Sequence, residues 1–324
     1  MKIAITGGTG FIGSHIVEAL AARGHEVTCL ARNPEKEKIF AGLPVRFVHG
    51  TMDSTEALSR LVKRQDVVIH LAGLTKAGSF EEYVRANVGG TEKLLEAMRT
   101  SSPAPRQFVL FSSAEAMGPS PGGAPLTEDA EPKPFTAYGK SKMMAEQCAE
   151  RVSGEIPVTI IRPPAVYGPR DKDVAILFRL LSRGFQPVVR PLPSFSVLYV
   201  KNLAAAICQV VEGVRAGVRS YFLTDGKPCS WLEFGCLIAR ALGKKTLRLV
   251  VPRAVIHAIA GAAGFLTAIT GKSGILSKDK IEALIGSWVV SDERARRELG
   301  YSPTYSTEQG ITETAEWYRE SGWL

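Results

Sequence analysis

Tyr138 and Lys142 are the residues whose types and spacing point most directly to chemistry. They lie four residues apart in a helical pattern, so both side chains share one face. A free tyrosine has a pKa of about 10 and is a poor acid or base at neutral pH, but a neighbouring ammonium group favours the phenolate and lowers that pKa. The pair can therefore move protons, although the same spacing is also common on exposed helices.

A glycine-rich loop near the start of the chain indicates a phosphate-binding site. Gly7, Gly10 and Gly13 follow the apolar run 2–6 and precede an amphipathic helical pattern. Glycine lets the backbone turn tightly and approach a pyrophosphate, and the following helix offers free N–H groups and a positive dipole end. This context predicts dinucleotide binding; an ordinary tight turn is the alternative.

Short apolar runs alternate with helical patterns through the first 165 residues. The predicted strands are 2–6, 26–30, 45–49, 67–71, 107–112 and 158–162, and the helical patterns are 12–23, 56–63, 80–99 and 138–152. Strands joined through helices require crossovers, so we expect a parallel sheet with helices on both faces. After residue 165 the alternation becomes irregular.

Several motifs, taken in order, resemble those of the extended short-chain dehydrogenases/reductases, the NAD-dependent epimerase/dehydratase group. The motifs are TGGTGFIGSH at 6–15, HLAG at 70–73, NVGGT at 87–91, FSS at 111–113, YGKSK at 138–142 and RPPAVYGP at 162–169. The resemblance covers nearly the whole chain. With the strand pattern, it implies an α/β fold with a Rossmann-type doubly wound parallel sheet and a smaller C-terminal mixed α/β lobe. Residues 1–165 would form the NAD(P)-binding domain, to which 196–212 return, and 166–324 mostly the substrate lobe.

The resemblance implies that Ser113, Tyr138 and Lys142 are the catalytic residues. Ser113 would hold the substrate oxygen, and Tyr138 would move the proton while a hydride passes between the substrate carbon and the nicotinamide. Lys142 would also bind the nicotinamide ribose, and Asn87 would order the backbone beside the cofactor. The expected cofactor contacts are Gly7, Gly10, Phe11, Ile12, Gly13, Arg32, Leu71, Ala72, Gly73, Asn87, Tyr138, Lys142 and Pro163.

The end of the second predicted strand bears on the choice of cofactor. Many members of the resembled family have an aspartate there that binds the ribose 2′-hydroxyl, whereas this sequence has Ala31 followed by Arg32. An arginine can pair with a 2′-phosphate that an aspartate would repel. We therefore expect NADP(H) to be favoured, with NAD(H) as the alternative if Arg32 points into solvent.

The expected substrate residues depart from the nucleotide-sugar members of the family. Those usually have an arginine for the diphosphate where Phe195 stands here, and an aspartate where Asn202 stands. A phenylalanine cannot neutralise a diphosphate, so the chain resembles the 3β-hydroxysteroid dehydrogenase and dihydroflavonol reductase-like branch, whose substrates are apolar. Arg170 or Arg190 is an alternative cation. The candidate substrate residues are Glu115, Tyr167 and Phe195.

Composition excludes several other classes of protein. The 324 residues are 45% hydrophobic and 22% charged, which is too apolar for a disordered chain. The five cysteines form no CxxC pair and the five histidines are scattered, so we predict neither a disulfide framework nor a metal site. Residues 240–280 hold eight Lys or Arg and one acid, a charge of +7 out of a net +8. Because no nucleic-acid reader motif accompanies them, a solvated basic face is the simpler interpretation.

Residues 254–270 form an uncharged stretch of 17 residues between Arg253 and Lys272. This stretch is too short and too rich in Ala and Gly to predict a membrane span. It can be a buried helix of the small lobe or an interfacial helix that makes a weak contact with a membrane surface. Because no secretory signal is visible, we expect a cytoplasmic location, peripheral to the membrane in the second case.

The sequence as a whole predicts an NADP(H)-preferring oxidoreductase that interconverts a secondary alcohol and a ketone. The expected substrate is a hydrophobic small molecule, such as a sterol-like, isoprenoid or phenolic compound. The alternatives are a nucleotide-sugar epimerase or reductase and, from another class, a non-catalytic NADP-binding sensor. The family resemblance also implies a homodimer through the helices 80–99 and 138–152.

Overall fold

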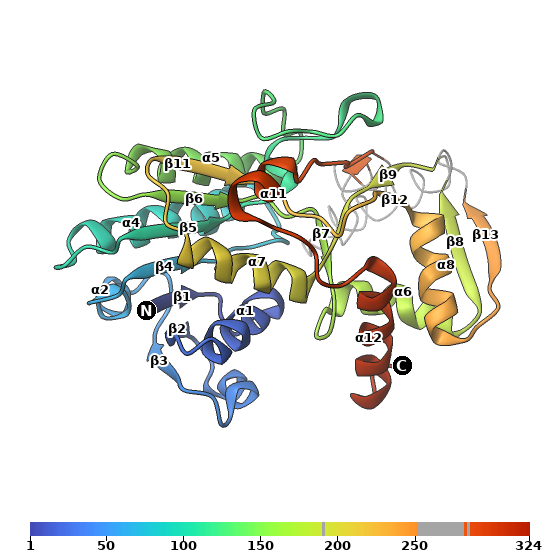
Figure 1. Ribbon diagram of the computed structural model, residues 1–324, viewed down its shortest axis with the longest axis horizontal. Helices are drawn as coiled ribbons and strands as arrows, with labels where there is room; N and C mark the ends of the chain where they lie inside the picture. Colours follow the sequence, from blue (N-terminus) through green and yellow to red (C-terminus); the bar gives the residue numbers. More distant parts are fainter. Residues whose placement is uncertain (190–191, 252–281, 284–285) are drawn as a thin grey trace.

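A seven-stranded sheet crosses the centre of the molecule in the order β11–β6–β5–β4–β1–β2–β3 (Figure 1). The computed structural model describes the chain except residues 190–191, 252–281 and 284–285. All neighbouring strands of the sheet are parallel. The strands are β1 (Lys2–Thr6), β2 (Glu26–Ala31), β3 (Val45–His49), β4 (Val67–His70), β5 (Gln107–Phe111), β6 (Val158–Ile161) and β11 (Val218–Tyr221). The doubly wound parallel sheet expected from the sequence is confirmed.

Helices cover both faces of the sheet because the side chains of each strand alternate between them. Ile3 and Ile5 of β1 pack with one helical layer, whereas Ala4 packs with the other. Figure 1 shows the first layer on one side of the sheet and α4 and α5 on the other. The first layer is α1 (Phe11–Ala22) and α7 (Val200–Glu212), and the second is α2 (Thr55–Val62), α4 (Gly90–Arg99) and α5 (Ala137–Arg151).

Two elements from the second half of the chain join the sheet domain. α7 packs along α1, and β11 extends the sheet beyond β6. The sheet domain is therefore built from residues on both sides of position 165.

The C-terminal lobe is built around a cluster of aromatic side chains, including Phe178, Phe195, Phe234 and Tyr318. Within the described part of the lobe, three two-stranded sheets and three helices surround it. The strands are β7 (Ala165–Tyr167), β8 (Phe185–Val189), β9 (Ser194–Phe195), β10 (Val197–Tyr199), β12 (Cys229–Ser230) and β13 (Leu247–Val251), and the helices are α6 (Lys172–Ser182), α8 (Trp231–Leu242) and α12 (Thr307–Glu320).

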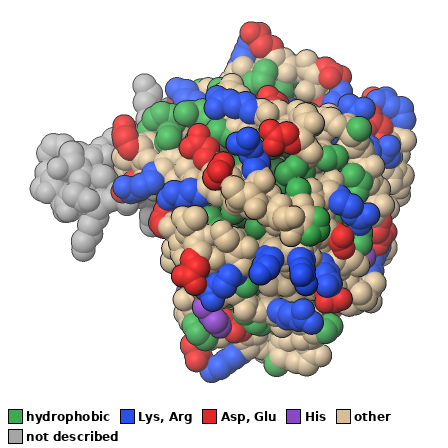
Figure 2. Space-filling model, turned by 90° about the vertical axis from the view of Figure 1, so that its left-hand side faces the viewer, with side chains coloured by type: hydrophobic (Ala, Val, Ile, Leu, Met, Phe, Trp, Pro, Cys, Tyr) green, Lys and Arg blue, Asp and Glu red, His purple; other side chains and the backbone are tan. Residues whose placement is uncertain are grey.

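Short helical turns complete the connections between the main elements. They are η1 (Pro34–Phe40), α3 (Phe80–Tyr83), the π-helical η2 (Val84–Gly89), η3 (Ala114–Ala116), η4 (Pro121–Gly123) and α11 (Glu293–Leu299). Figure 2 looks at the left-hand side of Figure 1, where acidic and basic side chains are interspersed. Among the described residues, no helix is both long and apolar enough to cross a membrane.

The carboxyl ends of the central strands hold the loops that carry the predicted motifs. Residues 7–10 follow β1, 71–75 follow β4, 112–113 follow β5, and 163–164 follow β6. Ligands of open parallel α/β sheets bind at this edge, in a crevice outside the carboxyl ends of the strands.

Candidate active site

The loop of residues 7–13 brings α1 close to the end of β1. Gly7 has a φ of 74°, and a Cβ on it would lie 2.7 Å from the backbone nitrogen of Ala72. A Cβ on Gly13 would lie 2.2 Å from the carbonyl oxygen of Gly7, so neither position has room for a side chain. The N-cap of α1, Gly10, provides no side-chain cap, and the first turn has no acidic residue. The N-terminus of α1 therefore offers backbone N–H groups and a positive dipole end to an anion, which fits the pyrophosphate of a dinucleotide.

A buried hydrogen-bond chain holds the ends of β1 and β4 together. The backbone N–H of Ala72 donates to Oγ1 of Thr6 at 3.2 Å, and Oγ1 lies 2.6 Å from Nδ1 of His70. Burial lowers the pKa of His70 to about 3, so the imidazole is neutral and Nδ1 can accept the threonine proton. His70 is thus part of the scaffold beneath the cleft.

Asn87 fixes the loop that follows β4. Its Oδ1 accepts the backbone N–H of Leu74 at 2.8 Å, and its Nδ2 donates to the carbonyl oxygen of Leu74 at 3.1 Å. Nδ2 also donates to Oγ of Ser141 at 2.9 Å, and Ser141 donates to the carbonyl oxygen of Tyr138 at 2.7 Å. Asn87 therefore links the loop after β4 to the helix that carries Tyr138.

Tyr138 and Ser113 meet where α5 packs against the loop after β5. Ser113 shares a hydrogen bond with the Tyr138 hydroxyl group. The next residue of α5 is Gly139, where a Cβ would lie 2.3 Å from the carbonyl oxygen of Glu115. Thr136 caps α5 by accepting the N–H of Gly139 at 2.9 Å, and its hydroxyl donates to the Glu115 carboxylate at 2.8 Å. The glycine lets the helix approach closely enough for the serine and the tyrosine to bond.

The pKa of Tyr138 lies above its ordinary value in this structure, and not below it as expected from the sequence. Burial of the half-buried ring is the main cause, the negative charge of Glu115 adds to it, and the hydrogen bond from Ser113 opposes it. Nζ of Lys142 donates instead to the carbonyl oxygen of Phe111, at the end of β5. Tyr138 is therefore held in its protonated form, ready to donate a proton.

Lys142 is buried one turn after Tyr138 on α5. Burial lowers its pKa to about 8, and the carboxylate of Glu146 in the following turn partly opposes the shift. Nε and Nη2 of Arg162 donate to the two oxygens of the Glu146 carboxylate, at 3.1 and 2.8 Å. The charge of Lys142 therefore depends on pH in the neutral to mildly alkaline range.

The glycine loop, Ser113, Tyr138 and Lys142 line one cleft of about 970 Å³. It brings together most of the residues expected from the sequence, from the glycine loop to the catalytic trio. The expected residues that line the cleft are Gly7, Gly10, Phe11, Ile12, Gly13, Leu71, Gly73, Ser113, Tyr138, Lys142 and Pro163. The expected residues that do not line it are Arg32, Ala72, Asn87, Glu115, Tyr167 and Phe195.

Tyr167 and Phe195 lie in the interior of the C-terminal lobe. Tyr167 is 1% exposed, and its hydroxyl donates to the carboxylate of Asp225 at 2.9 Å. Phe195 is 4% exposed and stacks on Trp231, with ring centroids 4.3 Å apart. Both side chains pack in the core of the lobe, so neither is available as a substrate contact in the cleft.

Arg32 and Glu115 flank the cleft without lining it. Arg32 is exposed directly after β2. Glu115 lies behind Tyr138, where its charge acts on both Tyr138 and Tyr83. Ala72 and Asn87 act through the backbone of the loop that does line the cleft. Arg190 and residues 254–270, which the sequence also singled out, lie outside the described residues.

The structure adds cleft residues that the sequence analysis missed as contacts. Lys36 of η1 lines the cleft beyond the end of β2. Ser112 also lines it, and its buried hydroxyl has no hydrogen-bond partner among the described residues, as expected of a group awaiting a ligand. Trp317 and Trp323 reach the cleft from the far end of the chain. The FSS motif contains Ser112, whereas no motif in the sequence indicates Lys36.

Arg170 is the remaining candidate for binding a diphosphate. It lines the cleft and has a φ of 72°, which is unusual for arginine. Its guanidinium donates to Oγ of Ser14 at 2.8 Å and to Glu18 at 2.6 Å. The Glu18 carboxylate therefore already compensates its charge. Among the described residues, no group of three or more His, Cys, Asp or Glu side chains could hold a metal ion.

A family model for the NAD-dependent epimerase/dehydratase family matches residues 3–222. The chain belongs to this family. The match includes the glycine loop, Ser113, Tyr138 and Lys142. It confirms the family resemblance and the NAD(P)-dependent oxidoreductase/epimerase class expected from the sequence.

Relatives of the chain within the family act on different substrates. The chain is 29% identical to a ceramide reductase of Caulobacter vibrioides, over 99% of this chain and 96% of that protein. It is 27% identical to a 3-beta-hydroxysteroid dehydrogenase of Mycolicibacterium neoaurum, over 98% of this chain and 92% of that protein. The fold is also that of UDP-glucuronic acid 4-epimerase from Bacillus cereus, solved in complex with NAD, with a TM-score of 0.79, 21% identity and 99% of both chains covered.

Proposed function

We propose that this protein is an NADP(H)-preferring oxidoreductase that interconverts a secondary alcohol and a ketone on a hydrophobic small molecule. One observation carries the proposal: Ser113 is bonded to Tyr138, and both line a cleft with Lys142 and the glycine loop. When bound, the nicotinamide would supply or accept the hydride. The glycine loop and the N-terminus of α1 would hold its pyrophosphate.

The proposed role of this chain is to hold the substrate oxygen and to move its proton. Ser113 and Tyr138 bind that oxygen with their hydroxyl groups, and the raised pKa of Tyr138 keeps its proton available for a ketone. In the reverse direction Tyr138 would act as the phenolate, which the positive charge of Lys142 favours, and the phenolate oxygen would accept the proton of the alcohol. Lys142 and the Phe111 carbonyl oxygen fix each other at the cleft wall.

The proposed substrate class rests on the cleft and on the relatives. Apolar side chains form part of the cleft wall; they include Pro163, Pro164, Val166, Val174, Trp317 and Trp323. Two relatives along nearly the full length of the chain are named for ceramide and for a steroid, which are both hydrophobic molecules. A sterol-like, isoprenoid or phenolic alcohol or ketone fits this pattern.

NADP(H) preference is proposed from two cations near the end of β2. Arg32 is exposed directly after the strand, and Lys36 lines the cleft from η1. The strand itself ends in buried Ala31, so no carboxylate from this position opposes a 2′-phosphate. NAD(H) is the alternative, and it is the cofactor of the structural neighbour.

A nucleotide-sugar epimerase or reductase is the second candidate function. Arg170 favours it because a diphosphate entering the cleft could compete with Glu18 for the guanidinium group. Calorimetric titration of the NADP(H)-loaded protein with UDP, dTDP and GDP separates the two candidates. We expect no binding; binding of any one at micromolar concentration would contradict an apolar substrate and favour the second candidate.

The oligomeric state, the cellular location and the domain organisation also belong to the proposal. We propose a homodimer through 80–99 and 138–152, a cytoplasmic location, and a sheet domain (1–165 with 196–212) that holds the cofactor while 166–324 mostly hold the substrate. Light scattering of the protein as it elutes from a size-exclusion column measures its molecular mass and so tests the homodimer. A monomer, or a dimer unaffected by charge substitutions on the exposed faces of these helices, would contradict it.

A further inference from the structure

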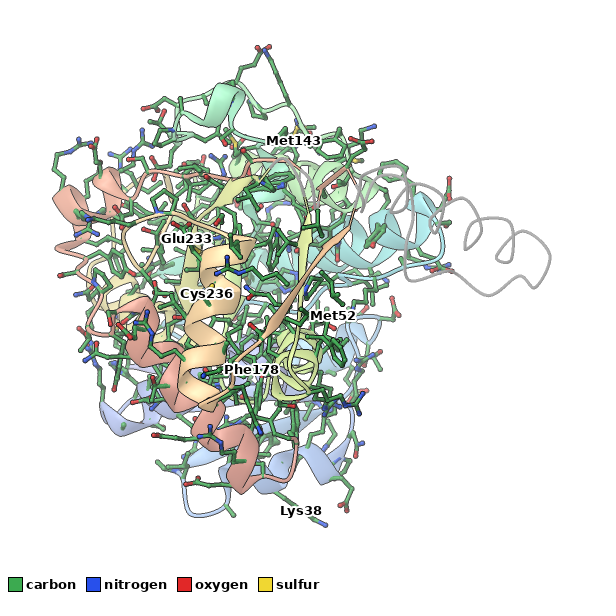
Figure 3. All side chains as sticks on the ribbon, turned by 90° about the vertical axis from the view of Figure 1, so that its right-hand side faces the viewer. Lys38, Met52, Met143, Phe178, Glu233 and Cys236 are labelled. Atoms are coloured by element: carbon green, nitrogen blue, oxygen red, sulfur yellow. The ribbon has the colours of Figure 1, made fainter. Side chains whose placement is uncertain are left out.

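The outer face of the two-stranded sheet β8–β13 is an exposed apolar surface. β8 and β13 pair in parallel, with Phe185 opposite Leu247. Phe185 is 43% exposed, Leu247 63% and Leu249 44%. These three side chains share one face, because residues alternate between the two faces of a strand. Figure 1 places the pair at the right-hand edge of the molecule, and Figure 3 looks directly at that end.

The β8 half of the opposite face is already covered. Gln186 is buried, and its side chain donates to the carbonyl oxygen of Leu232 at 2.9 Å, so it packs against α8. Val188, two residues further along β8, is 3% exposed. The β8 side of the inner face therefore belongs to the lobe's packing, although Val250 of β13 is 55% exposed on that face. The outer apolar face has no partner among the described residues. Exposed apolar patches of this kind mark interaction surfaces.

Positive charges surround this outer face. The segments 174–189 and 234–251 contain six Lys or Arg and no acidic residue. Arg179 and Arg240 are used within the lobe, by the Trp323 carbonyl oxygen and by Glu308. Arg248 lies opposite Gln186 on the inner face, where it reaches Cys236 of α8. The remaining three are exposed and in no ion pair with another described residue; they are Arg183, Lys244 and Lys245. This pattern differs from the face in Figure 2, where both signs are mixed.

Three of these cations lie at one end of the apolar face. Arg183 ends α6 just before β8, and Lys244 and Lys245 precede β13. The backbone N–H of Leu247 donates to the carbonyl oxygen of Gly184 at 2.8 Å, which holds the two turns side by side. Apolar side chains and a cluster of cations are thus displayed together at the surface.

We propose that the β8–β13 face docks onto an anionic lipid surface. Leu247, Leu249 and Phe185 would enter the boundary between headgroups and acyl chains, and the flanking cations would pair with anionic headgroups. A second copy of this chain is a poorer occupant, because a twofold contact through this face would bring two positively charged surfaces together. β13 also leads in sequence to the uncharged residues 254–270, which lie outside the described residues.

The purpose of this docking rests on the proposed function, since an apolar substrate dissolves in lipid. The contact itself does not need substrate, so it is tested without it. Flotation of the full-length protein is measured with vesicles of phosphatidylcholine alone and with vesicles that also contain phosphatidylglycerol. We expect binding to the anionic vesicles only, decreasing as salt screens the charges. No binding to the anionic vesicles would overturn the proposal, whereas the proposed chemistry would be unaffected.

Two double variants test whether this face makes the contact. Leu247→Ser with Leu249→Ser removes two of the apolar side chains, and Lys244→Gln with Lys245→Gln removes two of the cations. Each double variant should weaken vesicle binding roughly tenfold or more. Lys63→Gln with Arg64→Gln, an adjacent exposed pair at the end of α2, is the matched control and should bind like the wild type. Unchanged NADPH binding and thermal unfolding in solution show that each variant is folded.

Two outcomes would contradict the proposed lipid partner. If the face variants bind vesicles as tightly as the control, the contact lies elsewhere on the chain. If the face variants lower the molecular mass in solution by dissociating an oligomer, the partner of this face is a second copy. Loss of anionic-vesicle binding in both double variants, with mass unchanged, supports the lipid surface.

Discussion

The side-chain amide of Asn87 donates to the hydroxyl oxygen of Ser141 at 2.9 Å, and this bond joins the loop after β4 to α5. The same amide group binds the backbone of Leu74 on both its N–H and its carbonyl oxygen. One buried side chain therefore sets the distance between the wall of the cleft and the helix of Tyr138 and Lys142. Three hydrogen bonds of one side-chain amide thus hold the loop after β4 and α5 together beside the candidate site.

Removing Asn87 should loosen the cleft and destabilise the fold together. Asn87→Ala leaves the Leu74 backbone groups and Ser141 without their partner, so we expect the free energy of unfolding to fall by about 2–4 kcal/mol and cofactor binding to weaken. Ser141→Ala removes only the bond to α5 and should cost about 1 kcal/mol. Urea unfolding and NADPH titration measure both effects; equal losses in the two variants would contradict this account.

Tyr138→Phe should abolish most turnover while leaving cofactor binding intact. The variant removes the hydroxyl that bonds to Ser113, so we expect kcat to fall roughly 10²–10⁴-fold. Tyr83→Phe is the matched control, because the Tyr83 ring lies 5.9 Å from the Tyr138 ring but its hydroxyl bonds to the Thr75 backbone. Unchanged turnover in Tyr138→Phe would contradict the catalytic role of Tyr138. Absence of turnover in the wild type, with unchanged NADPH binding in the variant, would favour the non-catalytic NADP-binding sensor.

Lys142 should make stability rise with pH in the alkaline range. Its pKa is lowered by burial from 10.5 to about 8, so between these values the unfolded chain keeps a proton that the folded chain has lost. The unfolded state then binds more protons, and the free energy of unfolding contributed by this residue increases with pH. Below the lower value both states are protonated and the contribution is constant.

The pH dependence is checked by comparing urea unfolding of the wild type and of Lys142→Met at several pH values. We expect the difference in slope to appear above pH 8. Lys140→Met, at an exposed position on the same helix, should keep the wild-type slope. A Lys142→Met slope equal to that of the wild type would show that Lys142 is not desolvated.

Arg32 and Lys36 should discriminate between the two nicotinamide cofactors. Arg32→Gln and Lys36→Gln each remove a charge that can pair with the 2′-phosphate, so we expect the Kd for NADPH to rise roughly tenfold in each variant. The Kd for NADH should change little. Lys38→Gln is the control, because Lys38 pairs with Glu35 on the same turn and points into solvent (Figure 3). If both Kd values rise equally, these cations do not read the 2′-phosphate.

Gly13→Ala should prevent the glycine loop from forming. Its Cβ would lie 2.2 Å from the carbonyl oxygen of Gly7, so α1 must shift and the pyrophosphate site is lost with it. Gly89→Ala is the control, because a Cβ there meets nothing within 4 Å and the backbone is helical. We expect Gly13→Ala to lose NADPH binding in calorimetry, and Gly89→Ala to gain about 0.5–1 kcal/mol of stability.

Features that depend on local spacing could be predicted from the amino-acid sequence alone. The alternating apolar runs and helical patterns predicted the parallel sheet. Hydrophobic periodicity is a local property, and strands joined through helices require crossover connections. Gly7 and Gly13 were predictable because only glycine suits a loop this tight. Tyr138 and Lys142 share a helix face whatever surrounds them, since residues four apart always do.

The surroundings of each of these groups depend on how distant segments of the chain pack together. Tyr138 has a raised pKa because burial and the charge of Glu115 outweigh the hydrogen bond from Ser113. Tyr167 and Phe195 became core residues because the C-terminal lobe packs their rings together, which no local pattern records. Lys36 of η1 lines the same cleft as the glycine loop, a placement that depends on packing between distant segments. Burial and charge are sums over neighbours that are remote in sequence, so these environments had to be observed.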